Sequence, residues 1–185
     1  MLDVRPLALA GVLEIRPRQF ADDRGFFSEV WNAQSFGDAG IDLAFVQDNH
    51  SLSRERGVLR GLHYQLPPVA QDKLVRVTRG SILDVAVDIR RSSPGFGQWV
   101  AVTLSASDWN QLLVPKGFAH GFVTLEPDTE VQYKVTAPYS AAHDRSIRFD
   151  DPTIGVEWPF PAADLILSDK DQAAPPLAEA EVFDA

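Results

Sequence analysis

Large apolar side chains recur at every second position in several short segments of this chain. Within residues 81–90 they all fall on one face of an extended backbone: Leu83, Val85, Val87 and Ile89. Smaller or charged side chains occupy the opposite face: Asp84, Ala86 and Asp88. A period of two is typical of a strand with one face in the core, so we expect a half-buried strand here.

Further short apolar or alternating segments are also expected to form strands: 99–104, 112–114, 131–135 and 146–149. Residues that favour turns separate them, such as Pro94-Gly95 and Asp151-Pro152. Helical signals are confined to 31–39 and to 169–181, where two prolines interrupt the pattern. Many short strands with almost no long helix predict an all-β fold, such as a sandwich, a jelly roll or a small barrel.

The composition narrows the function classes. The 185 residues are enough for one domain, which we expect to span 1–185, and the net charge of −9 argues against a general nucleic-acid binder. The chain has no Cys, which excludes disulfide scaffolds and thiolate metal sites and is consistent with a cytoplasmic location. The apolar run at residues 7–13 is far shorter than the ~20 residues of a membrane-spanning helix, so no membrane association is expected.

Positive charge is concentrated in one part of this acidic chain. Residues 54–91 hold eight basic and four acidic side chains, a net charge of +4. This local excess suggests a small anionic ligand rather than a polymer. The glycine-rich phosphate-binding fingerprints are missing, so any phosphate must be held by side chains such as the planar guanidinium of Arg.

The four histidines raise the question of a metal site. His120 follows Pro115-Lys116-Gly117, an arrangement that metal-binding cupin barrels use for one ligand. The other element of such sites is a His-x-His pair, and the segment Gly61-Leu62-His63-Tyr64-Gln65 has only one His. A catalytic metal normally needs three protein ligands, so we expect no metal. In an extended 59–64 segment, His63 would lie on the face opposite Arg60.

Several motifs together resemble the dTDP-4-dehydrorhamnose 3,5-epimerase family, whose members are cupin-like enzymes without a metal. The resemblance is carried in order by 23–29, 47–51, 57–68, 73–76, 84–90, 114–122, 132–134, 150–152 and 167–171. It implies a cupin-like jelly-roll barrel with a few short peripheral helices, a homodimer and no cofactor. It also implies inversion of C3 and C5 of dTDP-4-dehydro-6-deoxy-D-glucose through an enolate, giving dTDP-4-dehydro-L-rhamnose.

The same resemblance implies the site residues. His63 is the expected base, Tyr133 the proton donor on the opposite face of the sugar, and Lys73 the group that stabilises the enolate. Asp171 is the expected partner of His63, with Asp84 as the competitor. The expected substrate-binding residues, with Tyr139 stacking on the thymine, are Arg24, Glu29, Gln47, Asp48, Asn49, Arg60, His120, Tyr139, Asp144 and Lys170.

Other functions stay open at this level. A single-site 3- or 5-epimerase of a related sugar nucleotide shares most of these motifs, and we take Tyr133 to favour the double epimerase. A metal-dependent cupin enzyme is a second alternative, and a sugar-nucleotide sensor without catalysis is a third. Among the aromatic residues, Phe26, Phe27, Phe118 and Phe122 are expected in the core rather than at the ligand.

Overall fold

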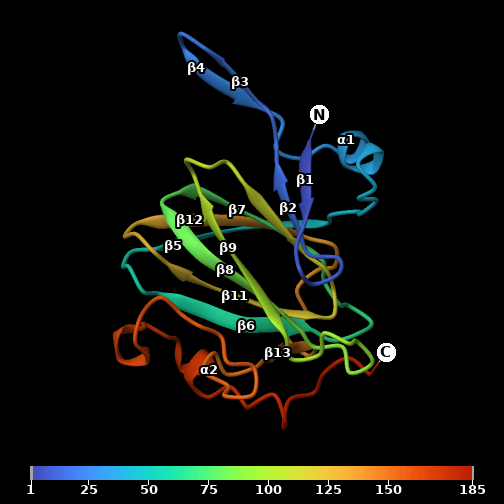
Figure 1. Ribbon diagram of the computed structural model, residues 1–185, viewed down its shortest axis with the longest axis vertical. Helices are drawn as coiled ribbons and strands as arrows, with labels where there is room; N and C mark the ends of the chain where they lie inside the picture. The colour runs from blue at the N-terminus through green and yellow to red at the C-terminus, as the bar shows by residue number, and fades with distance from the viewer. Residues whose placement is uncertain (1, 185) are drawn as a thin grey trace.

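Two antiparallel sheets face each other and form a jelly-roll barrel in the computed structural model, which describes residues 2–184 (Figure 1). The six-stranded sheet has the order β1-β2-β10-β7-β12-β5, and the five-stranded sheet the order β13-β6-β11-β8-β9. The bounds in the first sheet are Asp3–Pro6, Leu13–Arg16, Gln111–Val114, Lys73–Arg79, Thr129–Val135 and Gln47–Ser53. Those in the second are Asp144–Ser146, Leu59–Gln65, Phe118–Thr124, Ser81–Asp88 and Trp99–Ser105. The all-β expectation is confirmed.

The space between the sheets is partly core and partly open. One part is filled by a cluster of buried apolar side chains, including Val75, Ile82, Leu104, Leu112 and Phe122. The interior faces of the strands also carry polar side chains, and those define the site described below. Outside the six-stranded sheet, the short helix α1 (Ala33–Asp38) packs Phe36 over Ile15 and Leu74. The side chain of Asn32 caps this helix by accepting from two backbone N–H groups, which explains why it starts within the predicted 31–39 segment.

Strand β8 differs from the expectation because both of its faces are buried. Asp84 and Asp88 are 0% and 1% exposed and lie on the same side of the strand. The other side, with Val85 and Val87, is covered by the C-terminal segment through Leu177, Val182 and Phe183. The alternating pattern therefore marks a strand correctly but not its exposure, because a distant part of the chain packs over the outer face.

The prediction of a strand at 146–149 is wrong in its bounds. The observed strand β13 covers Asp144–Ser146 and pairs with β6 up to His63. Ile147 still exchanges backbone hydrogen bonds with Leu62, at 2.9 and 3.1 Å, but a bulge in β6 ends the regular ladder there. The expected helical segment 169–181 forms only the short helix α2 (Asp169–Gln172), and η1 (Ala162–Asp164) precedes it.

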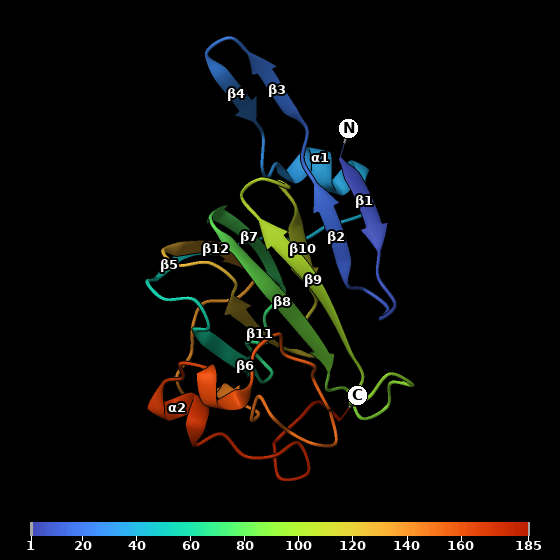
Figure 2. The same cartoon turned by 60° about the vertical axis from the view of Figure 1, so that its left-hand side comes forward.

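The hairpin of β3 (Gln19–Asp22) and β4 (Gly25–Ser28) projects away from the barrel, at the end opposite α2 (Figures 1 and 2). Phe26 and Phe27 on this hairpin are 53% and 70% exposed, so their expected burial is wrong. Phe118 and Phe122 are buried as expected. None of the helices within residues 2–184 has the length and apolar character needed to cross a membrane.

Candidate active site

A cavity of about 430 Å³ lies between the two sheets. The five-stranded sheet contributes His63 from β6 and His120 from β11, and the six-stranded sheet contributes Lys73 from β7 and Tyr133 from β12. Segments distant in sequence thus direct a set of titratable side chains into one space. Such a set in a cavity is typical of an active site.

A bulge in β6 brings Arg60 to the same cavity as His63. In the pairing with β11, Arg60 lies opposite Phe122 and His63 opposite His120, so β6 advances by three positions where β11 advances by two. The simple alternation that put Arg60 and His63 on opposite faces is therefore wrong, since both line the cavity. Gly61 makes the bulge possible: its φ is +146°, and a Cβ there would lie 2.5 Å from the Cα of Gly121.

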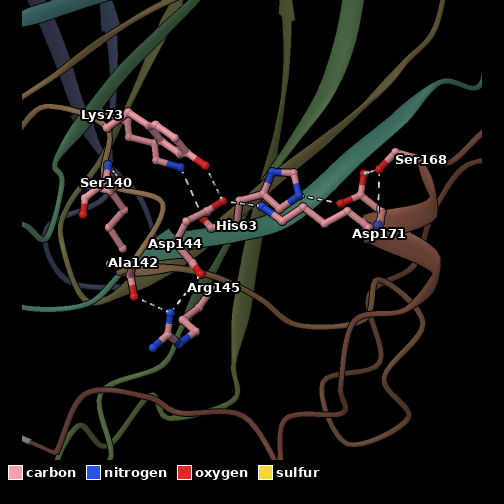
Figure 3. Close-up of polar contacts among 11 residues, drawn as sticks. His63, Lys73, Ser140, Ala142, Asp144, Arg145, Ser168 and Asp171 are labelled. Atoms are coloured by element: carbon pink, nitrogen blue, oxygen red, sulfur yellow. Dashed lines mark hydrogen bonds and ion pairs between the residues drawn. The ribbon is translucent and has the colours of Figure 1, made fainter.

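His63 is held by a carboxylate from the C-terminal segment. Its Nε2 lies 2.5 Å from Oδ1 of Asp171, the residue of α2 that is buried (Figure 3). Ser168 caps α2 by accepting from the Asp171 N–H and donates its hydroxyl to Oδ2 of the same carboxylate, at 2.9 Å. Burial raises the pKa of Asp171, but the hydrogen bonds from His63 and Ser168 outweigh it and leave the pKa below its ordinary value. The carboxylate therefore stays ionised and accepts a hydrogen bond from the Nε2–H of His63.

The competing carboxylate pairs with the other histidine. Oδ1 of Asp84 lies 2.6 Å from Nε2 of His120, and both side chains are almost fully buried. Of the two partners left open for His63 by the sequence, the structure brings Asp171 into contact. The site thus holds two carboxylate–imidazole pairs, one at each histidine.

Lys73 is buried between the sheets, and its Nζ donates to the backbone carbonyl of His63 at 3.2 Å (Figure 3). Burial lowers the pKa of Lys73 to about 8, and the charges of Asp84 and Asp144 oppose that change. At neutral pH the side chain is therefore mostly an ammonium group, which can stabilise negative charge that develops in the cavity.

Tyr133 faces the same space from β12. Burial raises the pKa of its phenol above the ordinary value, with the nearby charge of Arg60 acting in the opposite direction. The phenol is therefore protonated at neutral pH and can donate a proton.

A second cavity of about 290 Å³ adjoins the first, and His63, Lys73 and Tyr133 line both. Its wall includes further expected binding residues: Gln47, Asn49, Tyr139, Asp144 and Lys170. Asp144 accepts hydrogen bonds from Lys170 and from the Tyr139 hydroxyl, at 2.5 and 3.2 Å. The two cavities form one polar site, with an exposed aromatic ring, Tyr139, at its outer end.

Three expected binding residues lie away from both cavities. Arg24 is on the turn of the projecting hairpin and pairs with Asp22. Glu29 accepts from Asn32 and Ser35 next to α1. Asp48 points outward from β5 and pairs with Lys134, because its neighbours Gln47 and Asn49 take the inward positions.

Sequence reasoning gave no site role to Ser168, which supports Asp171. A signal was present, because Ser168 and Asp171 have the spacing of a capping box with an acidic residue at its third position. The pairing of Asp84 with His120 had a weaker signal, since it depends on the side-by-side positions of β8 and β11.

A larger cavity, of about 960 Å³, lies elsewhere, along the β8–β9 loop, the loop after β10 and Phe183. Its guanidinium, Arg90, is engaged by Asp88 through two hydrogen bonds of 2.9 and 2.7 Å. We therefore place the chemistry in the smaller cavity, which holds the supported imidazoles, the buried ammonium and the phenol.

A jelly-roll barrel with an acid–base site of this composition is what a cupin-like carbohydrate epimerase requires. The family model described as dTDP-4-dehydrorhamnose 3,5-epimerase matches residues 6–179, and the chain belongs to that family. An enzyme of that description from Sinorhizobium fredii is 54% identical over 176 residues, covering 95% of this chain and 90% of the relative.

Solved structures agree with this assignment. The epimerase of Legionella pneumophila in complex with dTDP-4-keto-L-rhamnose superposes with a TM-score of 0.95 at 41% identity, covering 100% of this chain and 99% of the other. A 3'-monoepimerase of Streptomyces bikiniensis, solved with dTDP and with a histidine and a tyrosine replaced, has a TM-score of 0.85 at 35% identity, covering 94% and 86%.

Proposed function

We propose that this chain inverts C3 and C5 of dTDP-4-dehydro-6-deoxy-D-glucose and forms dTDP-4-dehydro-L-rhamnose, a step of dTDP-rhamnose biosynthesis. One observation carries the proposal: the His63–Asp171 pair and the Tyr133 phenol reach a single cavity from opposing sheets, with the Lys73 ammonium between the two cavities. Both carbons flank the C4 ketone, so their protons are acidic enough to be removed when the resulting enolate is stabilised.

His63 removes the proton. Because its Nε2–H donates to Asp171, the lone pair that can accept a proton is on Nδ1. The ionised Asp171 then stabilises the imidazolium that forms and keeps the ring in one orientation. This arrangement supports general-base catalysis near neutral pH, which contributes roughly 10²- to 10⁴-fold in typical enzymes.

Tyr133 returns a proton to the opposite face of the sugar, which inverts the carbon. Its raised pKa keeps the phenol protonated until the enolate is present. Between the two steps, the C4 oxygen carries negative charge, and the buried ammonium of Lys73 stabilises it. His63, Tyr133 and Lys73 together account for the reaction by proton transfer and electrostatic stabilisation.

The adjoining cavity takes the nucleotide. Tyr139 is 61% exposed at its outer end, where a thymine ring can stack on it, and Gln47, Asn49 and Asp144 offer hydrogen bonds to polar edges. Besides Lys73, the walls of the two cavities carry two cations, Arg60 and Lys170, and both can contact the diphosphate.

A homodimer accounts for the projecting hairpin. Two strands alone are marginally stable in water, and this hairpin exposes Phe20, Phe26 and Phe27. A second copy of the chain that covers these rings would bring Arg24 of one protomer toward the site of its partner. The cytoplasmic location expected from composition stays a prediction.

The direct test is proton exchange in deuterated water with the sugar nucleotide, followed by NMR. We expect deuterium at both C3 and C5 of the product, and unchanged protium at both positions would contradict the proposal. Deuterium at one carbon only would establish the single-site epimerase instead. One observation supports that alternative, namely the similarity to the 3'-monoepimerase of Streptomyces bikiniensis. That enzyme was solved with a histidine and a tyrosine replaced, so it also has a tyrosine of interest. The presence of Tyr133 alone therefore does not separate the two reactions.

A further inference from the structure

Asp84 is a buried carboxylate that the proposed proton transfers do not use. It is 0% exposed on β8, and its Oδ1 lies 2.6 Å from Nε2 of His120. Its Oδ2 is buried and makes no hydrogen bond with any residue of the described chain. Leaving a buried carboxylate oxygen unsatisfied is costly, so a carboxylate in this place calls for an explanation beyond packing.

The charged and titratable groups around Lys73 indicate what the carboxylate does. Arg60 and His63 come from β6, His120 from β11, Tyr133 from β12, Asp144 from β13, and Lys170 and Asp171 from α2. Burial acts most strongly against a charged Lys73, and the positive charge of Lys170 acts in the same direction. Asp84 and Asp144 are the carboxylates that act in favour of the charged form, and Asp84 has the larger influence of the two.

The two carboxylates are not equivalent. Asp144 accepts from Lys170 and Tyr139, so its charge is largely engaged at the outer cavity. Asp84 has one hydrogen bond, to His120, and an oxygen that is otherwise unengaged in a region of low dielectric constant. A charge in such surroundings acts on its neighbours with little screening.

We propose that Asp84 is a positioning residue of the enolate-stabilising side of the site: it keeps Lys73 in its ammonium form and holds His120 by Nε2, so that Nδ1 of that ring is left for the substrate. The inference rests on the proposed role of Lys73 in the reaction. It assigns one carboxylate to each side of the chemistry, Asp171 to the base and Asp84 to the groups that stabilise the enolate.

The test is Asp84→Asn, which keeps the size of the side chain and an oxygen that accepts from His120 but removes the charge. Two quantities are measured: the pH dependence of kcat, and the pKa of Lys73 by NMR of protein labelled in its four lysines. We expect the alkaline limb of the kcat profile and the Lys73 pKa both to move to lower pH by on the order of one unit, as for the loss of a nearby, poorly screened unit charge. Asp84→Glu retains the charge and is expected to leave both near their wild-type values, even where kcat falls.

Asp88→Asn is the matched control, because Asp88 is a buried carboxylate of the same strand that pairs with Arg90 outside the site. Asp88→Asn is expected to lower the free energy of unfolding without moving either the alkaline limb of the kcat profile or the Lys73 pKa. If Asp84→Asn does not fold, Asp84→Leu removes the same charge with an apolar side chain of similar size, and the same shift is expected.

The inference is overturned if the folded Asp84→Asn or Asp84→Leu variant shows neither a shift in the alkaline limb of the kcat profile nor a change in the Lys73 pKa. Equal shifts in the Asn and Glu variants also overturn it, because geometry rather than charge would then be responsible. The NMR titration needs no substrate, so it tests the coupling of Asp84 to Lys73 even if the deuterium experiment refutes the 3,5-epimerase reaction.

Discussion

The imidazole of His63 and the carboxylate of Asp171 lie 2.5 Å apart, although 108 residues separate them in the chain. The base comes from β6, an inner strand of the five-stranded sheet, and its partner comes from a four-residue helix in the segment that covers the outside. The C-terminal segment therefore does more than bury the outer face of the sheet, since it completes the acid–base site.

Asp171→Asn tests this relationship. The amide keeps the size of the side chain but removes the charge that stabilises the imidazolium, so kcat is expected to fall by roughly 10²- to 10⁴-fold, with a smaller change in KM. Steady-state kinetics measure it. Asp169→Asn is the matched control, because Asp169 lies on the same helix but is exposed. Comparable losses in both variants would show that the helix, not the carboxylate, is what matters.

Tyr133→Phe removes the proton donor and leaves the ring. We expect the inverted product to form roughly 10²- to 10⁴-fold more slowly, as measured by NMR of the product. The fold should be retained, because a Phe ring fits the space of the half-buried Tyr133 ring. Tyr64→Phe is the control. Its hydroxyl donates to the backbone carbonyl of Glu181 on the outside of the barrel, so its loss is expected to lower Tm with kcat unchanged. A Tyr133→Phe enzyme with normal turnover would exclude the phenol as the donor.

The fold was largely predictable from the sequence, but parts of the site were not. Alternation located β8 and β9 because a strand with unlike faces produces that pattern wherever it lies. It could not show that Val85 and Val87 would be covered, since the covering residues lie about ninety positions away. Side-chain roles at His63 and Tyr133 came from the family resemblance, because periodicity carries no information about chemistry.

Arg60 shows the limit most clearly. Strict alternation places Arg60 and His63 on opposite faces of β6, whereas the bulge at Gly61 brings both to the same face. A glycine inside a strand is a known indication of a bulge, but the sequence alone does not say how the register shifts. Asp48, by contrast, was placed with the binding residues by the motif around it, and ordinary alternation turns its side chain outward.

Gly61→Ala tests the bulge. A Cβ at φ +146° would lie 2.5 Å from the Cα of Gly121, which is backbone and cannot move aside easily. We expect a loss of about 1–3 kcal/mol in the free energy of unfolding, and a lower kcat because His63 shifts with the strand. Gly37→Ala in α1 meets no atom within 4 Å and is expected to stabilise by roughly 0.5–1 kcal/mol. Denaturant unfolding compares the two, and a neutral Gly61→Ala would mean that the bulge tolerates a side chain.

Phe27→Asp tests the proposed homodimer. The ring is 70% exposed at the projecting hairpin, so a single chain loses little when it is replaced. In a dimer that buries the hairpin, a carboxylate there would be desolvated, and we expect dissociation at micromolar concentration. Analytical ultracentrifugation measures it. Val46→Asp, at a position 59% exposed outside the hairpin, is the comparison, and identical sedimentation of wild type and Phe27→Asp would argue against a role of the hairpin in assembly.

Lys73→Met is expected to raise stability while it abolishes activity. Burial lowers the pKa of Lys73 from 10.5 to about 8, so the folded protein holds an ammonium group in an unfavourable place at neutral pH. The corresponding cost is about 3 kcal/mol. It is fully present below pH 8, where both the folded and the unfolded chain are protonated, and it disappears as pH rises from 8 to 10.5, because the folded state releases its proton first.

The stability difference between Lys73→Met and wild type should therefore favour the variant at pH 7 and shrink steadily toward pH 10.5. Chemical denaturation at several pH values measures it, with Lys116→Met as the control at an exposed lysine, for which no such trend is expected. Equal stability of Lys73→Met and wild type at pH 7 would mean that burial does not penalise the ammonium. A difference that grew with pH would reverse the sign and show that the charged form is the one the fold prefers. The expected result identifies Lys73 as a group kept for the reaction at the expense of stability.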